Sequence, residues 1–575
     1  MAARSEPADR MNQTRLFLVF AWLMVATLLW MAWGKDHAPV PVQSPAAASA
    51  NAIPRMVPGE ATSPVAAPTG ATVPAAPAIA QAGPAPAPAA LVHVRTDVLD
   101  VQLDGGGLHQ ADLVPYPSAQ AAGSAPVRLF STDTATYYAA QSGWVGEGGA
   151  AAPAHDGGFQ PEGDASPKVL ANGVARLEVP FVWHGPTGVT IRRVYTFTRG
   201  SYAVDVRDTV VNAGSAPWQG YVYRQLVRVP PVITGGYMHP ESFSFTGATW
   251  FGGDGYQRRA FKNFMDDGAV NSRVTGGWLA MPQHHFITAW IPQADQTALF
   301  SLMRTGNVDG ISAAGPAFTV APGQQATTSA RLWVGPKDVA QLAALHVAGL
   351  DRAVDYSRFS IFAVLGQGLF WLLRQLHALI GNWGWAIIGL VVLLKLALFP
   401  LSNAQYKSAA KMRRVQPRMQ QLKERYGDDK QKFQMAMMEL YKTEKINPAG
   451  GCLPIIPQTI IFMTLYWVLS EAVELRHAPW IGWIHDLTAR DPYFVLPVLN
   501  AAIMIATQHL TPMAPGMDPT QQKMMKMMPI IFGGVLAFLP AGLVLYQVAN
   551  GALGLLQQWY MLRRHGDGPS RAKKA

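Results

Sequence analysis

The sequence predicts a polytopic α-helical membrane protein that carries a large antiparallel β-domain outside the bilayer. The first observation is composition: 49% of the 575 residues are hydrophobic and 14% are charged, whereas about a quarter of an ordinary soluble protein is charged. Second, several segments hold about 20 mostly apolar residues, which is the length that a helix needs to cross a bilayer. Third, residues 91–336 contain many short runs in which apolar and polar side chains alternate, as they do in half-buried strands.

Six segments are predicted to span the membrane. The first, 16–33, is followed by Gly-Lys-Asp-His rather than by a small-residue cleavage site, so we interpret 1–35 as an uncleaved signal anchor. The long run 524–562 is divided into two spans by Pro540-Ala541-Gly542. The other three predicted spans are 383–401, 452–470 and 493–510.

The basic residues indicate one orientation for all of these spans. The segment 402–447 carries eleven Lys or Arg residues against five acidic ones, and five more basic residues follow the last span. Positively charged loops stay in the cytoplasm. Both termini are therefore predicted to be cytoplasmic, and the segment 34–357 is predicted to lie on the other side of the membrane.

The outer segment is predicted to contain a tether, a β-domain and a helical connection. Residues 36–90 are rich in Ala and Pro and hold too few bulky apolar side chains to fold, so they are predicted to be a disordered linker. The spacing of runs and turns in 91–336 favours an antiparallel β-sandwich. Residues 337–382 are predicted to return to the membrane as a helical stretch at 337–356 and an amphipathic interfacial helix at 359–380.

The cytoplasmic segment 402–447 is predicted to be a helical hairpin. Two helix-favouring runs, 403–426 and 430–445, flank the turn Gly427-Asp428-Asp429, and Pro417 is expected to kink the first. Because methionine side chains adapt to varied partners, the hairpin is a candidate contact for apolar nascent chains. An equally weighted alternative is a basic loop held on anionic headgroups. The candidate client-contact residues are Met412, Arg413, Arg414, Met419, Met435 and Met438.

Lys395 is the most informative single residue. It is the one plainly charged residue inside the apolar part of a predicted span, and no Asp or Glu lies within the six spans. A charge at membrane depth costs about 2.5–3.5 kcal/mol, so it usually marks a functional or hydrated position. The simpler interpretation is that its long stem reaches the inner headgroups. We favour the functional interpretation because other polar residues lie near it.

These polar residues predict a hydrated groove. On the last span Gln547, Asn550 and Gln558 share one helical face with Gly554, and Tyr546 adjoins it. Gln458 and Thr459 enter the third span at about the depth of Lys395. Hydrogen bonds between helices would explain each residue alone. Together with an unpaired lysine, they indicate a groove that opens to the cytoplasm.

Several segments of the chain resemble the YidC family of membrane protein insertases, Gram-negative type. The resemblance extends over nearly all of 355–563. It is carried by NWGWAI (382–387), PLSNAQYKSAAKMRRVQPRMQQLKERYGDDKQK (400–432), LYKTEKINPAGGCLPIIPQ (440–458), WIHDLTARDPY (483–493), QQKMMKMMPIIF (521–532) and PAGLVLYQVAN (540–550). Two positions depart from the family pattern. The groove charge is typically arginine and is Lys395 here, and the second aromatic residue expected after Tyr546 is Gln547.

The resemblance implies a fold, a function and a set of partners. The fold would be a five-helix insertase core at 383–565, a basic tail at 566–575, and a periplasmic β-supersandwich. The protein would insert and help fold nascent membrane proteins in the bacterial inner membrane, alone or with the Sec translocon components SecYEG and SecDF. It implies no cofactor, no metal and no specific nucleic acid. The basic tail has two interpretations, contact with ribosomal RNA or topology alone, and we favour the second.

Two other classes of protein would explain parts of the sequence. A secondary transporter with a charged midplane site would explain Lys395, but the spans show no inverted repeat and no titratable partner for the charge. A membrane-anchored enzyme would bind sugars by stacking them on tryptophans of the β-domain, yet tryptophans in such a domain are more often core residues. They are Trp144, Trp183, Trp218, Trp250, Trp278, Trp290 and Trp333. The pairs His284-His285 and His485-Asp486 lack the spacing of a zinc site or catalytic triad, and the single Cys452 allows no internal disulfide.

Overall fold

The computed structural model describes residues 90–232, 244–266, 268, 270–354, 360–426, 429–444, 455–510 and 519–565. The predicted signal anchor, the predicted linker up to residue 89, Cys452 and the predicted tail 566–575 lie outside these residues. So do the side chains of Met412, Arg413 and Arg414.

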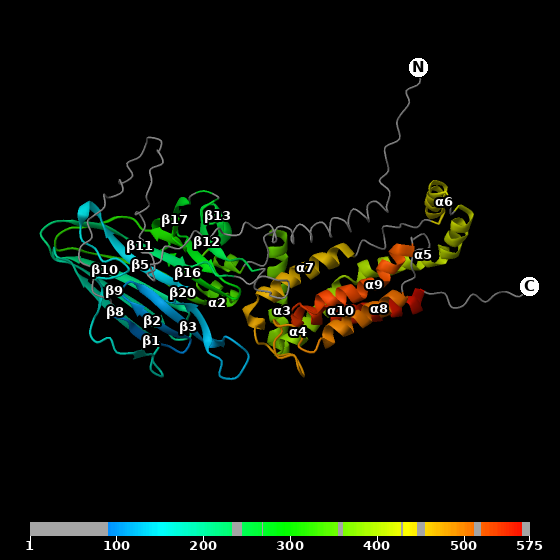
Figure 1. The fold of residues 1–575 in the computed structure, drawn as a ribbon, viewed down its shortest axis with the longest axis horizontal. Helices are drawn as coiled ribbons and strands as arrows, with labels where there is room; N and C mark the ends of the chain where they lie inside the picture. Colours follow the sequence, from blue (N-terminus) through cyan, green and yellow to red (C-terminus); the bar gives the residue numbers. More distant parts are fainter. Residues whose placement is uncertain are drawn as a thin grey trace, which may run out of the picture. The chain divides into compact units, whose positions relative to one another are not determined.

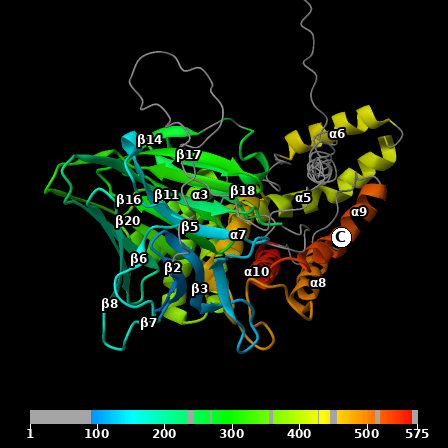
Figure 2. The same cartoon turned by 60° about the vertical axis from the view of Figure 1, so that its left-hand side comes forward.

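The β-domain consists of two sheets (Figure 1 and Figure 2). Eleven strands form the first sheet, in the order β14 (Asn271–Thr275), β17 (Thr297–Thr305), β18 (Val308–Ala314), β11 (Trp218–Arg228), β5 (Tyr138–Gly146), β3 (Gly107–Pro117), β2 (Leu99–Asp104), β1 (Val92–Arg95), β7 (Lys168–Val169), with β19 (Phe318–Val320) beside β11 and β4 (Pro126–Phe130) beside β3. Nine strands form the second, in the order β13 (Gly255–Ala260), β12 (Gly247–Gly252), β15 (Trp278–Pro282), β16 (Phe286–Pro292), β20 (Gln325–Pro336), β10 (Ala203–Asn212), β9 (Val189–Thr198), β8 (Arg176–His184), β6 (Gln160–Pro161). Among the described strands, neighbours pair antiparallel except β1 with β7.

The predicted alternation of side chains is present in the strands. Along β9 buried residues alternate with more exposed ones over the whole strand, because successive side chains of a strand point to opposite faces. All seven tryptophans singled out in the sequence are buried, at 9% exposure or less. The prediction that they are core residues is therefore confirmed, and they offer no sugar-stacking face.

A buried ion pair lies within this core. Arg193 Nε donates to Asp208 Oδ1 at 2.7 Å, and both side chains are fully buried. The indole of Trp144, from the other sheet, donates to Asp208 Oδ2 at 3.0 Å. The carboxylate thus links the two sheets through charged and neutral donors. Removal of one partner from such a buried pair strongly destabilises the fold, because the other charge is left buried without compensation.

The connection after the β-domain differs from the prediction of one helical stretch at 337–356. The structure has a short helix α2 (Val339–Ala344) and a 3₁₀ turn at Leu350–Ala353. The break comes where His346 and Gly349 adopt positive φ values of 54° and 69°. Left-handed residues end helices, and glycine adopts this conformation without a steric penalty.

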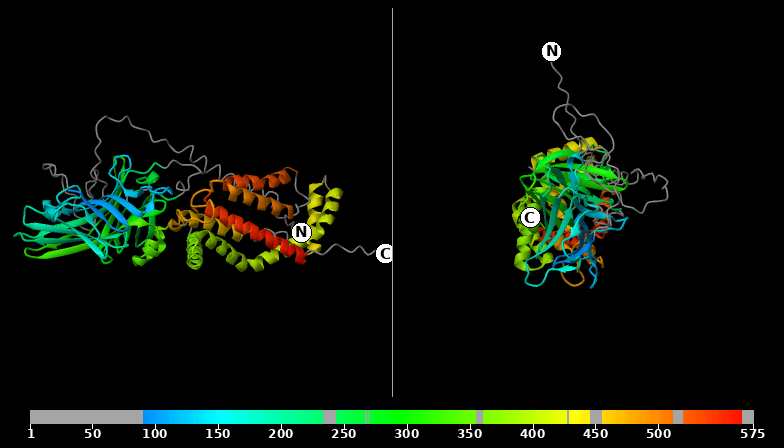
Figure 3. Two further views of the ribbon diagram at one scale, coloured as in Figure 1. Left: turned by 90° about the horizontal axis from the view of Figure 1, so that it is seen from below. Right: turned by 90° about the vertical axis from the view of Figure 1, so that its left-hand side faces the viewer.

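Eight longer helices follow in the described residues: α3 (Ser360–Ile380), α4 (Trp383–Ala397), α5 (Phe399–Tyr426), α6 (Lys430–Thr443), α7 (Ile455–Glu471), α8 (Val495–Leu510), α9 (Pro519–Leu536) and α10 (Ala541–His565). Helices α8, α9 and α10, orange to red in Figure 3, run beside one another. Within the residues that the structure describes, no helix combines the length and the hydropathy that crossing a membrane requires. The predicted six spans are therefore not confirmed here.

The helix bounds agree closely with the helices expected from sequence, with two informative differences. Helix α4 ends at Ala397, earlier than the expected Leu401, because Pro400 has no N–H to continue the hydrogen bonds of α4; it lies instead in the first turn of α5. Helix α5 continues through Pro417 to Tyr426. The hairpin of α5 and α6 has its own small core, in which Val415 and Met419 are 5% and 2% exposed.

Candidate functional site

The loop 472–494 provides hydrogen-bond acceptors for the first turns of helices α8 and α10. Asp491 Oδ2 accepts from the backbone N–H of Leu496 at 2.7 Å and so caps α8. At the start of α10, the N–H of Ala541 donates to Ala489 O and that of Gly542 to Leu487 O, at 2.7 and 2.8 Å. These bonds satisfy N–H groups that have no partner within their own helix.

A cavity of about 560 Å³ lies among helices α4, α5, α7, α8, α9 and α10. Its apolar wall is formed by Val391, Leu394, Leu398, Leu401, Ile461, Ile503, Met504, Pro529 and Phe532. Its polar lining consists of Lys395, Ser402, Gln405, Gln458, Asn500, Thr507, Gln508, Tyr546, Gln547, Asn550, Gln557 and Gln558. Eight of these twelve polar residues are carboxamides, which both donate and accept hydrogen bonds.

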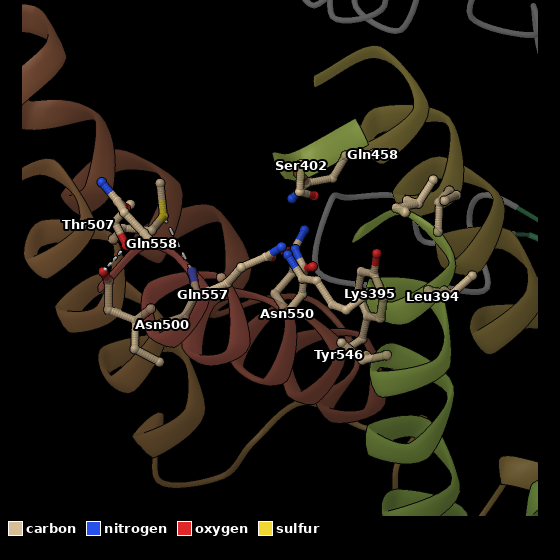
Figure 4. A pocket seen from close by; sticks show the side chains of 18 of the residues that line it. Leu394, Lys395, Ser402, Gln458, Asn500, Thr507, Tyr546, Asn550, Gln557 and Gln558 are labelled. Carbon is tan, nitrogen blue, oxygen red and sulfur yellow. Dashed lines mark hydrogen bonds between the residues drawn. The ribbon is translucent and has the colours of Figure 1, made fainter. Parts of the chain in front are cut away.

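Lys395 extends from α4 toward α10, as Figure 4 shows. A Cβ atom built on Gly554 would lie 3.4 Å from Lys395 Nζ, so the ammonium group is close to the α10 backbone. None of the described lining residues is acidic. The cavity therefore presents one positive charge on a wall of neutral polar groups.

Helix α10 contributes the largest share of the polar lining. Tyr546, Gln547, Asn550, Gln557 and Gln558 recur at the spacing of one helical face. The ring of Tyr546 is stacked at 6.4 Å on that of Phe462 from α7. Asn550 and Gln558 are only 8% and 7% exposed.

Two buried amides in the lining differ in their hydrogen bonding. The Nε2 atom of Gln557 is buried and has no hydrogen-bond partner among the described residues. Asn500 on α8 is 3% exposed, and its Nδ2 donates to Met504 Sδ at 3.5 Å. Buried amide groups are costly unless water or a ligand satisfies them.

The chemistry of the lining excludes several kinds of active site for this cavity. The described lining residues include no His, Cys, Asp or Glu. Nucleophilic catalysis by a triad needs a base beside the nucleophile, and a protein zinc site needs thiolate, imidazole or carboxylate ligands. These side chains can form hydrogen bonds with a polar chain and can attract an anion.

The structure brings together most of the predicted groove. Lys395, Gln458, Tyr546, Gln547, Asn550 and Gln558 all line the cavity, whereas Thr459 is exposed and is not part of its lining. Sequence reasoning missed Ser402 and Gln405 on α5 and the polar face of α8. That face was visible as Asn500, Thr507 and Gln508, at offsets of seven and eight in an apolar run.

The hairpin residues lie apart from this cavity. Met435 and Met438 are 65% and 45% exposed on α6, while Met419 is buried between the two helices of the hairpin. The structure describes the side chains of three predicted client-contact residues, and of these Met435 and Met438 are accessible. His284 and His285 are placed elsewhere, against the end of α7.

Comparisons with known proteins cover almost the whole chain. Residues 375–567 match the family model described as the 60Kd inner membrane protein, and residues 91–372 match that of the YidC periplasmic domain. The chain is 59% identical over 570 residues to a protein of Stenotrophomonas maltophilia (strain R551-3) named membrane protein insertase YidC, covering 98% of this chain and 99% of the relative. A relative of the same name from Xanthomonas campestris pv. campestris (strain 8004) is 58% identical over 581 residues, covering 98% and 100%. A solved structure of an active YidC insertase is 19% identical, with a TM-score of 0.36, and covers 82% of this chain and 92% of that one.

Proposed function

Because the chain belongs to the YidC family of membrane protein insertases, we propose that its cavity around Lys395 receives the hydrophilic part of a client protein during insertion into the inner membrane. The observation that carries this proposal is the lining itself: one lysine and eight carboxamides, with no acidic residue among the described lining residues. Such a lining attracts a chain that brings its own carboxylate and peptide groups.

The proposed mechanism lowers the barrier for moving polar groups past the bilayer. The hydrocarbon core is about 30 Å thick and leaves backbone and charged groups without partners. In the cavity a client segment exchanges water for amide, hydroxyl and ammonium groups, so it has a shorter apolar distance left to cross. Burial of the client's apolar helix in lipid then drives release, at about 25 cal/mol per Å² of apolar surface.

The charge on Lys395 gives the groove its selectivity. An ammonium group attracts an acidic residue of the client's translocated segment and repels a basic one. Lysine replaces the planar two-pronged contact of arginine with a single point charge on a flexible stem. Contacts of this kind form and break readily, which suits a client that passes through.

We further propose the topology predicted from the sequence. Six spans would place both termini and the hairpin 402–447 in the cytoplasm, with the β-domain 91–336 in the periplasm; the support is the distribution of basic residues. The exposed Met435 and Met438 of α6 would contact arriving apolar segments. Cooperation with SecYEG and SecDF, and a ribosome contact, belong to this proposal through the family resemblance alone.

The test is insertion of a small client with one acidic residue in its translocated segment, into vesicles that contain only the full-length protein. Lys395→Ala should reduce protease protection of that segment at least tenfold, because a hydrogen bond to a charged group contributes about 1.5–3 kcal/mol. Lys395→Arg should retain activity. Lys262→Ala, which removes an exposed lysine of the β-domain, is the control. Activity of Lys395→Ala equal to that of the wild type would refute the charged-groove mechanism.

A further inference from the structure

The end of helix α7 carries a buried carboxylate in an unfavourable place. Glu471 is the last residue of α7, where the partial negative charge of the helix C-terminus repels a carboxylate. Its side chain is 6% exposed, so water does not provide the compensation. Buried charges persist in proteins when they are paired and hydrogen-bonded. The partners of Glu471 come from the β-domain.

Both carboxylate oxygens of Glu471 are engaged. Lys337 Nζ lies 2.6 Å from Oε2, and its own side chain is 3% exposed. The hydroxyl of Ser244 donates to Oε1 at 2.6 Å. An ion pair with a second hydrogen bond on the other oxygen fixes the position of the carboxylate in two directions.

Two histidines of the β-domain contact the backbone at the same helix end. His284 Nε2 donates to the carbonyl oxygen of Ser470 at 2.8 Å, and His285 Nδ1 lies 3.5 Å from that of Glu471. Their rings stack at 3.9 Å. Burial, followed by the neighbouring His284, lowers the pKa of His285 well below its ordinary value, so this imidazole is neutral. The last carbonyls of a helix have no partner within the helix, and these donors supply one.

Lys337 is held rigidly on the β-domain side. It follows β20 directly, and its backbone N–H donates to His285 O at 2.9 Å. The next residue, Asp338, caps α2 by accepting from the N–H of Ala340 at 2.8 Å. Lys337 is therefore fixed between a strand of the second sheet and a capped helix.

The opposite end of α7 reaches the cavity. Gln458 and Ile461 of this helix line it, and Glu471 lies thirteen positions after Gln458, about 20 Å along a helix. Between them, Leu465 and Val468 are buried at 1% and 0% exposure. We expect a helix packed in this way to transmit a change at Glu471 to Gln458.

We propose that Lys337, Ser244, His284 and His285 form a socket for the end of α7 and act as positioning residues for the cavity. The β-domain then does more than occupy the periplasm: it fixes the helix that carries Gln458 and Ile461. The role in insertion rests on the proposed function of the cavity, whereas the socket itself is a structural claim that is measured separately.

The experiment uses the full-length protein in lipid vesicles with two readouts. Deuterium exchange of the segment 462–476 reports whether the end of α7 is held, and protease protection of a client reports insertion. The variants are Glu471→Gln, which keeps the shape and removes the charge, Lys337→Met and the conservative Lys337→Arg. The control is Arg331→Met, which breaks an exposed β-domain ion pair to Asp205 with an N···O distance of 3.2 Å.

Glu471→Gln and Lys337→Met should each accelerate exchange at the end of α7 at least tenfold and reduce insertion at least threefold. Lys337→Arg, which keeps the positive charge, and the control Arg331→Met should each leave both readouts at the wild-type values. Unchanged exchange in Glu471→Gln and Lys337→Met overturns the socket. Faster exchange with full insertion overturns the positioning role. If the wild type inserts no client, the proposed function fails, and the exchange rates alone decide whether the socket stands.

Discussion

Reversing the charge at Lys395 should reverse the dependence of insertion on the client's charge. Lys395 is the one charged residue among the described residues that line the cavity, so no neighbouring acid masks the effect of its replacement. With Lys395→Glu, a client whose translocated segment carries an aspartate should insert poorly. The same client with lysine in place of that aspartate should insert well.

The magnitude follows from Coulomb's law and the position of the ammonium group. Two unit charges 4 Å apart interact with about 1 kcal/mol in bulk water and about 4 kcal/mol at an effective dielectric constant of 20. Lys395 is partly buried in a lining of neutral amides, so it lies between these limits. We expect a coupling free energy of about 2 kcal/mol, which corresponds to roughly a thirtyfold change in the relative insertion rates.

The assay is a double-mutant cycle in vesicles that contain only this protein. Wild type and Lys395→Glu are each combined with clients that carry aspartate, asparagine or lysine at one position of the translocated segment. Insertion is followed as protease protection over time, at 20 mM and 200 mM salt. A higher salt concentration should reduce the coupling only moderately, because a partly buried pair is screened less than an exposed one.

The asparagine client separates charge from general damage. It should insert at similar rates with both proteins, because it forms no ion pair with either side chain. If the coupling between position 395 and the client charge is below about 0.5 kcal/mol, the two sites act independently. The reasoning that Lys395 attracts the client's carboxylate would then be refuted, and the lysine would be a residue that merely reaches the headgroups.

Three further predictions concern the stability of the chain. Asp208→Asn should lower the free energy of unfolding by about 3–5 kcal/mol, because it leaves Arg193 buried without a counter-charge, and thermal unfolding in detergent measures this. Met419→Ala should destabilise the hairpin by about 2 kcal/mol, whereas Met435→Ala, at a position 65% exposed, should change it by less than about 0.5 kcal/mol; deuterium exchange of the hairpin compares them. Burial, followed by the nearby Asp338, raises the pKa of Glu474 from 4.5 to about 7. The free energy of unfolding should therefore be highest below pH 4.5 and should fall as the pH rises to about 7. Glu474→Gln should remove this pH dependence from the melting midpoint.

The polar face of α10 could be predicted from the sequence because it depends on one helix alone. The period of 3.6 residues fixes which side chains share a face, so Gln547, Asn550 and Gln558 were grouped without knowledge of their neighbours. The same rule separates Gln458 from Thr459. Consecutive helical residues point about 100° apart, and only Gln458 lines the cavity.

Other features depend on contacts between distant parts of the chain. Lys337 and Glu471 are 134 residues apart, and neither stands out in its own segment. The break in the predicted helix 337–356 depends partly on such a contact. Gly349 has a φ of 69°, and a Cβ atom there would lie 2.3 Å from the ring of Phe251. Its glycine was visible in the sequence, but the aromatic ring against it was not.

The balance of charge and neutral polarity in the cavity is consistent with a site that must release what it binds. A neutral hydrogen bond contributes only about 0.5–1.5 kcal/mol in net terms, because each partner gives up a bond to water. Eight carboxamides therefore offer a client many weak contacts rather than a few strong ones. A second lysine or arginine in the lining would add a charged contact worth about 1.5–3 kcal/mol and would slow departure by roughly tenfold or more. A single flexible charge, Lys395, selects the client, and the weak contacts around it let burial of the client's apolar helix in lipid prevail.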